Sequence, residues 1–254
     1  MRQARGYLPL HTSDEQDALL DRIIGAAGEA AGRLPSALGV FDLDGCLFDT
    51  RPRQVQLLRE LASREHLPEL YQVTPERFVG WSMRDTLLAS GLSPARVEQI
   101  YPAVRRAFEH GFFQPDAPRH DHAMPGAARL VWRCYKAGLH VVYLTGRHEE
   151  MRPATEASLL KNGFPWARPR TTLLMKPDAQ TADLFFKAEA LRELHLLGAP
   201  ALFLDNEPSN VNHFDEAHPE SLVVWVETDH SPRPVEPAAH LPALRGFLRT
   251  RDLG

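Results

Sequence analysis

A short apolar run that ends in two carboxylates constrains this chain more than any other feature. Residues 37–41 read Ala-Leu-Gly-Val-Phe, the composition of a buried strand, and Asp42, Asp44 and Gly45 follow. Side chains alternate along a strand, so the two carboxylates would share a side if the strand continued. Gly45 would let the backbone turn away there. Such a pair usually needs a divalent cation, and a carboxylate can also be a covalent nucleophile in phosphoryl transfer.

The part of the chain after residue 125 alternates between strand and helix patterns. Apolar runs predict strands at residues 139–145, 171–175, 201–205 and 221–226. Amphipathic stretches predict helices at residues 126–137, 149–162 and 184–197, and a short one from Pro208. This alternation predicts a three-layer α/β sandwich with a parallel, Rossmann-like sheet of about five strands. Beyond a linker at residues 232–237, the spacing of Leu241, Leu244, Phe247 and Leu248 predicts a final packed helix.

The first half of the chain carries helix signals on both sides of the first strand. Residues 13–16, Ser-Asp-Glu-Gln, form a capping box for a helix that ends near Gly32. We expect this helix to pack on the domain, with contact to a second subunit as the alternative. Residues 51–118 have no strong strand signal and predict a small all-helical insertion, with one of its helices running from residue 75 to 88. The predicted organisation is an extension at residues 1–36, an α/β core at 37–50 and 119–254, and the insertion at 51–118.

Two later strands also end in polar residues, at the sheet edge where ligands bind in parallel α/β folds. One strand is followed by Thr145, Gly146 and Arg147, whose hydroxyl and backbone donors could hold a phosphate oxygen. Another ends in Asp205 and Asn206, whose oxygens could bind a divalent cation. The carboxylates at the end of the first strand would lie at the same edge.

Two lysines are candidates to neutralise charge beside these carboxylates. Lys176 directly precedes Pro177, which biases it to extended geometry in a loop, where it could reach a distal part of a substrate. Lys187 lies near the start of a predicted helix, where a cation is unfavourable, and it interrupts an apolar stripe. A lysine in a position that is unfavourable for both reasons suggests a functional role. We therefore predict Lys187 as the catalytic lysine. The structural alternative is a stem that runs along the core edge with its ammonium in water.

These motifs resemble the signatures of the haloacid dehalogenase (HAD) superfamily. Residues 39–50 are similar to the first signature, in which hydrophobic residues precede Asp-x-Asp-Gly, although Cys46 stands where Thr or Val is usual. Thr145 corresponds to the Thr or Ser of the second signature. Asp205 matches the fourth signature, and Asn206 stands where many relatives have a second acid. The resemblance covers most of the chain.

The resemblance implies a Mg²⁺-dependent phosphomonoester hydrolase. Asp42 would attack phosphorus and form an aspartyl-phosphate, and Asp44 would protonate the leaving oxygen and then activate water. Mg²⁺ would be bound by Asp42, the backbone carbonyl of Asp44 and the pair Asp205 and Asn206. Thr145 and Lys187 would hold the phosphate, with Gly146, Arg147 and Lys176 as further substrate-binding residues. The insertion would be a cap that closes over the active site.

Three other functions stay open. A dehalogenase of the same superfamily would share the nucleophile but would need neither Asp44 nor an acidic metal site. In its place after Thr145 and Gly146, Arg147 also resembles members of the superfamily that act on phosphomonoesters, including acid phosphatases and polynucleotide 3′-phosphatases, so a nucleic-acid end-processing phosphatase is a narrower alternative. A catalytically silent binding protein is the third. His120, Asp121 and His122 could be imagined as metal ligands, but no matched spacing of Cys or His supports this, and we expect hinge or rim residues there.

Composition limits the partners. The 254 residues carry a formal net charge of −4 with a pI near 6.3, which gives no electrostatic reason to bind nucleic acid. No apolar run approaches membrane-spanning length, and the first residues lack the apolar segment of a signal peptide. Cys46 and Cys134 are expected to be free thiols, which favours the cytoplasm. We expect a small phosphorylated substrate as partner, and the sequence does not indicate the oligomeric state.

Overall fold

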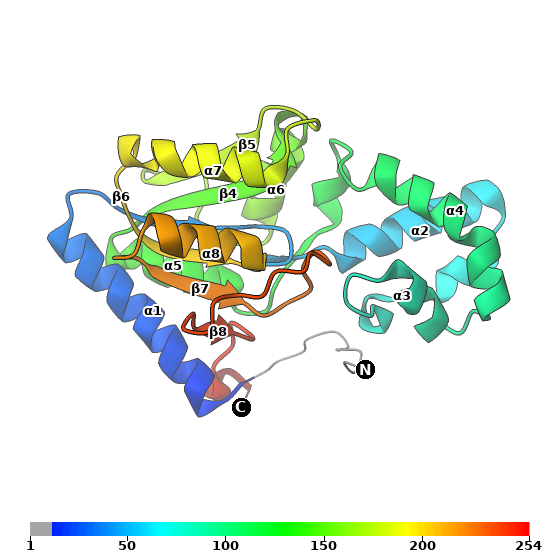
Figure 1. The fold of residues 1–254 in the computed structure, drawn as a ribbon, viewed down its shortest axis with the longest axis horizontal. Helices are drawn as coiled ribbons and strands as arrows, with labels where there is room; N and C mark the ends of the chain where they lie inside the picture. The colour runs from blue at the N-terminus through cyan, green and yellow to red at the C-terminus, as the bar shows by residue number, and fades with distance from the viewer. Residues whose placement is uncertain (1–11, 254) are drawn as a thin grey trace.

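The computed structural model describes residues 12–253, which form an α/β core and a helical lobe beside it (Figure 1). The core is built on a six-stranded sheet in the order β5-β4-β1-β6-β7-β8, with every pairing parallel. Its strands are β1 (Ala37–Phe41), β4 (His140–His148), β5 (Thr171–Lys176), β6 (Ala199–Asp205), β7 (Leu222–Val226) and β8 (Ala243–Leu244). The predicted parallel α/β sandwich is confirmed, with one strand more than expected.

Helices cover both faces of this sheet, so the strands are buried on both sides. On one face lie α1 (Asp14–Arg33) and α5 (Ala127–Ala137), and on the other lie α7 (Asp183–Glu193) and α8 (Pro208–Ala217). Alternate residues of β1 serve the two faces, because Phe41 packs with the α1 side and Val40 with the α7 side. The helix α6 (Arg152–Lys161) connects β4 to β5. No helix within residues 12–253 is both long enough and apolar enough to span a membrane.

The predicted capping box starts the first helix. Ser13 Oγ accepts a hydrogen bond from the Gln16 backbone N–H at 3.2 Å, and α1 runs to Arg33. Its apolar stripe is buried in the core of its own chain, with Ile23 and Ala27 fully buried against α5 and the sheet. Packing on the domain, the preferred prediction, is therefore what the structure shows. Residues 1–11 of the predicted extension lie outside the described residues.

The lobe contains α2 (Arg51–Glu65), α3 (Met83–Ala89) and α4 (Pro94–Gly111), which surround an apolar cluster of their own. The prediction of one helix over residues 75–88 was wrong. A short 3₁₀ helix, Pro75–Arg77, is separated from α3 by a loop in which Gly80 adopts a positive φ of 53°. Ser82 then starts α3 by accepting a hydrogen bond from the Asp85 N–H at 3.2 Å. The exact domain boundaries stay a prediction.

Both crossings between the core and the lobe belong to a small antiparallel sheet. Its strands are β2 (Phe48–Asp49), which follows the turn after Asp44, and β3 (His122–Ala123), which Asp121 separates from a 3₁₀ helix, Ala117–His120. The sequence predicted only a linker there. The expectation that Asp121 is a hinge or rim residue was wrong about its exposure, since its side chain is completely buried.

The final predicted helix was also wrong. The chain instead adds β8 to the sheet, with Trp225 opposite Ala243 and Val226 opposite Leu244. The backbone N–H groups of Trp225 and Glu227 donate to Pro242 O and Leu244 O at 3.0 and 2.9 Å. Without this strand, the edge of β7 would present unpaired backbone groups. Satisfying that edge outweighs the helical spacing of four apolar residues.

Candidate active site

The two carboxylates lie at the carboxyl edge of the sheet, as the motif predicts. The Asp42 N–H still donates to Leu204 O of β6 at 2.9 Å, so the nucleophile candidate is held at the last rung of the sheet. Gly45 then takes a positive φ of 80°, and a Cβ there would lie 2.5 Å from Asn206 Nδ2. The turn therefore needs a glycine for two reasons: the backbone conformation and the close approach of Asn206.

Lys187 joins the ends of two neighbouring strands. Its Nζ donates to Asp42 Oδ1 and to Asp205 Oδ2, both at 2.7 Å, and all three side chains are buried. Lys176, the other candidate, forms an ion pair with Asp183 at 2.6 Å. This geometry favours Lys187 for the catalytic role, because it is the lysine that contacts Asp42.

The charges in this group balance only when one of its two acids is protonated. Two carboxylates, Asp42 and Asp205, share one ammonium. Burial raises the pKa of Asp42 to about 8, with the Asp205 carboxylate adding to the effect and Lys187 opposing it. Burial would lower the pKa of Lys187, but Asp205 and Asp42 outweigh it and raise that pKa. A further cation beside Asp42 would favour its ionised form.

Asn206 supplies an oxygen that fits such a cation. Its Nδ2 donates to the Asp229 backbone oxygen at 2.7 Å, while its Oδ1 is buried and has no hydrogen-bond partner within residues 12–253. Both carboxylate oxygens of Asp205 already accept hydrogen bonds. Oδ1 accepts from the Glu207 N–H at 2.9 Å, and Oδ2 accepts from Lys187 Nζ at 2.7 Å and from Asn210 Nδ2 at 3.0 Å. Asn206 is therefore the better candidate for a direct metal ligand.

The donor set is of mixed type. Within residues 12–253, no three His, Cys, Asp or Glu side chains are grouped so that they could hold a metal ion. The ligands predicted here are instead the Asp42 carboxylate, the Asp44 backbone carbonyl and the Asn206 amide oxygen, with Asp205 behind them. Carboxylate, carbonyl and amide oxygens are hard donors that suit Mg²⁺, so the residues fit that ion.

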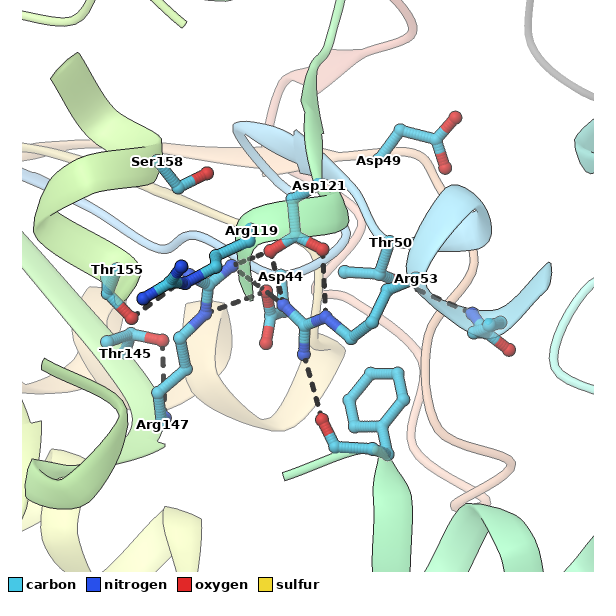
Figure 2. A network of polar contacts seen from close by, with 12 residues as sticks. Asp44, Asp49, Thr50, Arg53, Arg119, Asp121, Thr145, Arg147, Thr155 and Ser158 are labelled. Atoms are coloured by element: carbon cyan, nitrogen blue, oxygen red, sulfur yellow. Dashed lines mark hydrogen bonds and ion pairs between the residues drawn. The ribbon is translucent and has the colours of Figure 1, made fainter. Parts of the chain in front are cut away.

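A second buried group of charges lies behind Asp44 (Figure 2). Arg147 Nε and Arg53 Nη2 donate to Asp44 Oδ1 at 3.0 and 3.1 Å. Both guanidinium groups also contact Asp121, with Arg53 Nε at 2.8 Å from Oδ1 and Arg147 Nη2 at 2.7 Å from Oδ2. Thr155 Oγ1 accepts from Arg147 Nη1 at 3.2 Å. Two buried arginines thus lie between two acids, of which Asp121 is buried and Asp44 reaches the cavity with a side chain that is 24% exposed.

This group sets the ionisation of Asp44. Burial opposes the charged carboxylate, but the guanidinium groups of Arg147 and Arg53 outweigh it and lower the pKa of Asp44 to about 2. The sequence analysis missed Arg53 and Asp121 as residues of the site. They lie 68 positions apart in the chain, so no local spacing could have connected them. The flanking His120 and His122 are exposed.

The residues predicted to bind phosphate lie close to the carboxylates. Thr145 is buried in β4, three residues before the strand ends at His148, and its Oγ1 accepts a hydrogen bond from the Arg147 N–H at 3.3 Å. Gly146 lines the pocket, and a Cβ there would lie 2.6 Å from Asp183 Oδ2. The Arg147 guanidinium is fully buried among Asp44, Asp121 and Thr155. Its contact with substrate stays a prediction.

A cavity of about 420 Å³ opens in front of Asp42 and Asp44. The core side contributes the catalytic edge and the segment around Asp229, and the lobe contributes a group of aromatic side chains. Burial raises the pKa of Asp229, and Arg51 offsets this only in part. The pocket thus lies between the sheet edge and the lobe, as a capped active site requires.

Comparison with known proteins gives matches only among solved structures. No family model and no curated protein sequence matches the chain. Protein Tyrosine Kinase A of Mycobacterium tuberculosis aligns with 84% of this chain and 94% of its own, at 19% identity and a TM-score of 0.49. A haloacid dehalogenase-like hydrolase of Streptococcus pneumoniae aligns with 82% of this chain and 93% of its own, at 12% identity and a TM-score of 0.46. The class C acid phosphatase of Bacillus anthracis aligns with 84% of this chain and 78% of its own, at 14% identity and a TM-score of 0.46. Similarities this low do not assign a function, which has to be inferred from the site.

Proposed function

We propose that this chain is a phosphomonoester hydrolase of the HAD superfamily that acts through an aspartyl-phosphate on Asp42. The observation that carries the proposal is the buried contact of Lys187 with Asp42 and Asp205 at the carboxyl edge of a parallel sheet. A buried lysine between two acids next to a substrate-sized pocket is typical of a charge-stabilised phosphoryl-transfer site. The resemblance of the surrounding motifs to the HAD signatures supports the same assignment.

In the first step, an oxygen of Asp42 attacks phosphorus, and the bond to the ester oxygen breaks. Lys187 holds the attacking carboxylate through Oδ1 and keeps it from rotating. Thr145 and the backbone around Gly146 are placed to hold phosphate oxygens. In the second step, water attacks the phosphorus of the aspartyl-phosphate, which releases inorganic phosphate and restores the carboxylate. Most of the rate gain in such a site comes from position and charge.

Asp44 is the proposed proton carrier. The hydrogen bonds from Arg147 and Arg53 end on its Oδ1, which leaves Oδ2 as the oxygen for proton transfer. As a carboxylate, Asp44 can take a proton from the attacking water in the second step. In the first step it has to donate one, and an anionic phosphate next to it favours its protonated form.

Mg²⁺ is the proposed cofactor, held by Asp42, the Asp44 carbonyl and Asn206 with Asp205 behind them. When bound, it would neutralise charge on the phosphate and the nucleophile. Two observations support this assignment: Asn206 Oδ1 has no hydrogen-bond partner among the described residues, and Asp42 and Asp205 share a single ammonium. A small phosphorylated substrate is proposed because the pocket is of the size that takes small molecules. A cytoplasmic location is proposed because both cysteines are free and buried.

The test is a Mg²⁺-dependent screen against a library of phosphomonoesters, followed by intact-mass spectrometry with an activated ester. We expect a transient gain of one phosphoryl group on the protein, which Asp42→Asn removes together with turnover. Asp116→Asn is the matched control, since that acid is exposed. A fully active Asp42→Asn protein would falsify the mechanism. No turnover of any ester would favour a catalytically silent binding protein.

A further inference from the structure

The lobe side of the pocket is strongly apolar. The large apolar side chains that line the pocket from the lobe are Phe78, Trp81, Met83, Phe108, Phe112 and Phe113. Trp81 and Phe113 are 62% and 41% exposed, and neither belongs to the apolar cluster that holds the lobe together. Aromatic surface that faces a cavity and is not used for packing is available to the apolar body of a ligand.

The cations of the pocket are mostly neutralised. Arg51 is paired with Asp49 at 2.8 Å, and Lys187 is paired with Asp42 and Asp205. Arg233 also lines the pocket, as an exposed side chain in the segment that follows β7. Apart from Arg233, then, the lining cations have carboxylate partners, and a second anionic group on a substrate would have to compete with them.

Two acids of the pocket, away from the reacting carboxylates, have no cationic partner among residues 12–253: Glu207 and Asp229. The other lining acids, Asp49, Asp183 and Glu227, are paired with Arg51, Lys176 and Arg245. Glu207 accepts hydrogen bonds from the Ser231 N–H and Oγ, both at 2.7 Å, so Ser231 holds it without neutralising it. Asp229 reaches across the pocket towards the lobe, because a Cβ at Gly80, the neighbour of Trp81, would lie 3.8 Å from its Oδ1. A carboxylate and an exposed indole ring thus come from opposite sides of the cavity.

We infer that the pocket selects a phosphomonoester whose leaving group has an apolar, ring-sized body and carries a positive charge, not a second negative charge, at the end away from the phosphate. This inference rests on the proposed function and adds the chemistry of the leaving group. Aromatic faces attract cations through their quadrupole, and the Asp229 carboxylate adds to this attraction. A second phosphate or a carboxylate would meet the same groups with the opposite sign.

Three benzyl phosphates with the same leaving oxygen test the charge preference. They carry an aminomethyl, a methyl or a carboxylate group at the para position, so only the remote charge differs. We expect kcat/KM to fall in that order, with about a tenfold step between the aminomethyl and the carboxylate compound, the scale expected of a cation over an aromatic ring. The measurement uses the full-length protein with saturating Mg²⁺.

Variants connect the preference to the residues. Asp229→Asn should reduce the advantage of the aminomethyl compound over the methyl compound, and Trp81→Ala should raise KM for both. Tyr71→Ala is the matched control, because Tyr71 is also an exposed aromatic residue of the lobe, at 51%, but does not line the pocket. That control should leave the order of the three substrates unchanged. Arg233→Ala should change the rate for the carboxylate compound little.

The outcomes separate this inference from the proposed function. Hydrolysis of all three esters at equal efficiency, or a preference for the carboxylate compound that Arg233→Ala removes, would overturn the inference and leave the phosphatase assignment intact. An undiminished advantage of the aminomethyl compound over the methyl compound in Asp229→Asn would show that Asp229 does not select the charge and would overturn the inference as well. Absence of turnover and of protein phosphorylation with every ester in the wider screen would contradict the proposed function itself.

Discussion

Replacing Asp121 by alanine would leave two buried guanidinium groups short of a partner. Asp121 accepts hydrogen bonds from Arg53 Nε at 2.8 Å and from Arg147 Nη2 at 2.7 Å, and all three side chains are at most 1% exposed. Removing one partner from a buried ion pair costs about 3–5 kcal/mol. Asp44 would still face both arginines, so we expect a loss near the lower end, about 3 kcal/mol.

That loss is large against the total stability of a folded domain, which is typically about 5–15 kcal/mol. In a chain of this size, each kcal/mol lowers Tm by about 2–4 °C, so Asp121→Ala should lower Tm by about 6–12 °C. Urea unfolding followed by circular dichroism would report the free energy of unfolding, and a thermal melt would report Tm. Asp121→Asn keeps the shape and removes the charge, and should show a similar loss.

The matched control is Asp116→Ala. Asp116 pairs with Arg119 at 2.9 Å, but the two side chains are 78% and 65% exposed. Exposed pairs contribute about 0–1 kcal/mol, so Tm should stay within about 4 °C of the parent protein. If Asp121→Ala also changed Tm by no more than this, the buried group of charges would not stabilise the fold and the reasoning would be refuted.

Three further predictions follow from contacts in the site. Lys187→Ala should lower kcat about 100-fold or more, because a positioned charge beside the reacting group is lost, whereas Lys176→Ala should act mainly on KM. Steady-state kinetics of the two variants test this, and the reverse pattern would exchange the roles of the two lysines. Chelation with EDTA should abolish turnover and added Mg²⁺ should restore it, while Ca²⁺ should inhibit because it prefers looser and higher coordination; undiminished turnover after chelation would exclude the metal site. Cys46 and Cys134 are buried and burial raises both thiol pKa values, so a thiol reagent should label neither until the protein unfolds, and rapid labelling of the native protein would contradict this.

The prediction of the sheet succeeded where the pattern was local. The apolar runs that end at Asp42, Thr145 and Asp205 are each short, bounded by helix signals and mostly buried, so their strand character did not depend on distant partners. The errors arose where a distant element decided. Residues 241–248 have helical spacing, but pairing with β7 turned two of them into a strand, and the loop at Gly80 divided a predicted helix.

The residues of the site also divide into those that local sequence could indicate and those that it could not. That Lys187 has acidic partners could be anticipated from sequence, because a cation at a helix start within an apolar stripe is unfavourable unless it has a partner; its catalytic role stays a prediction. Asp121 could not be found in this way. It lies in a stretch rich in Pro and His that gives no sign of burial, and its partners are 68 and 26 positions away.

By itself, the sequence determined the parallel order of strands and helices and the identity of the carboxylates at the strand ends, because strand burial and the turn after Asp44 depend on neighbouring residues. Only the tertiary structure decided that Asp44 is held by two arginines, that Asn206 and not Asp205 keeps a free oxygen, and that aromatic residues of the lobe face the acids of the core. Those contacts join segments far apart in the chain. Their energies depend on distance and burial in space, which the order of residues does not contain.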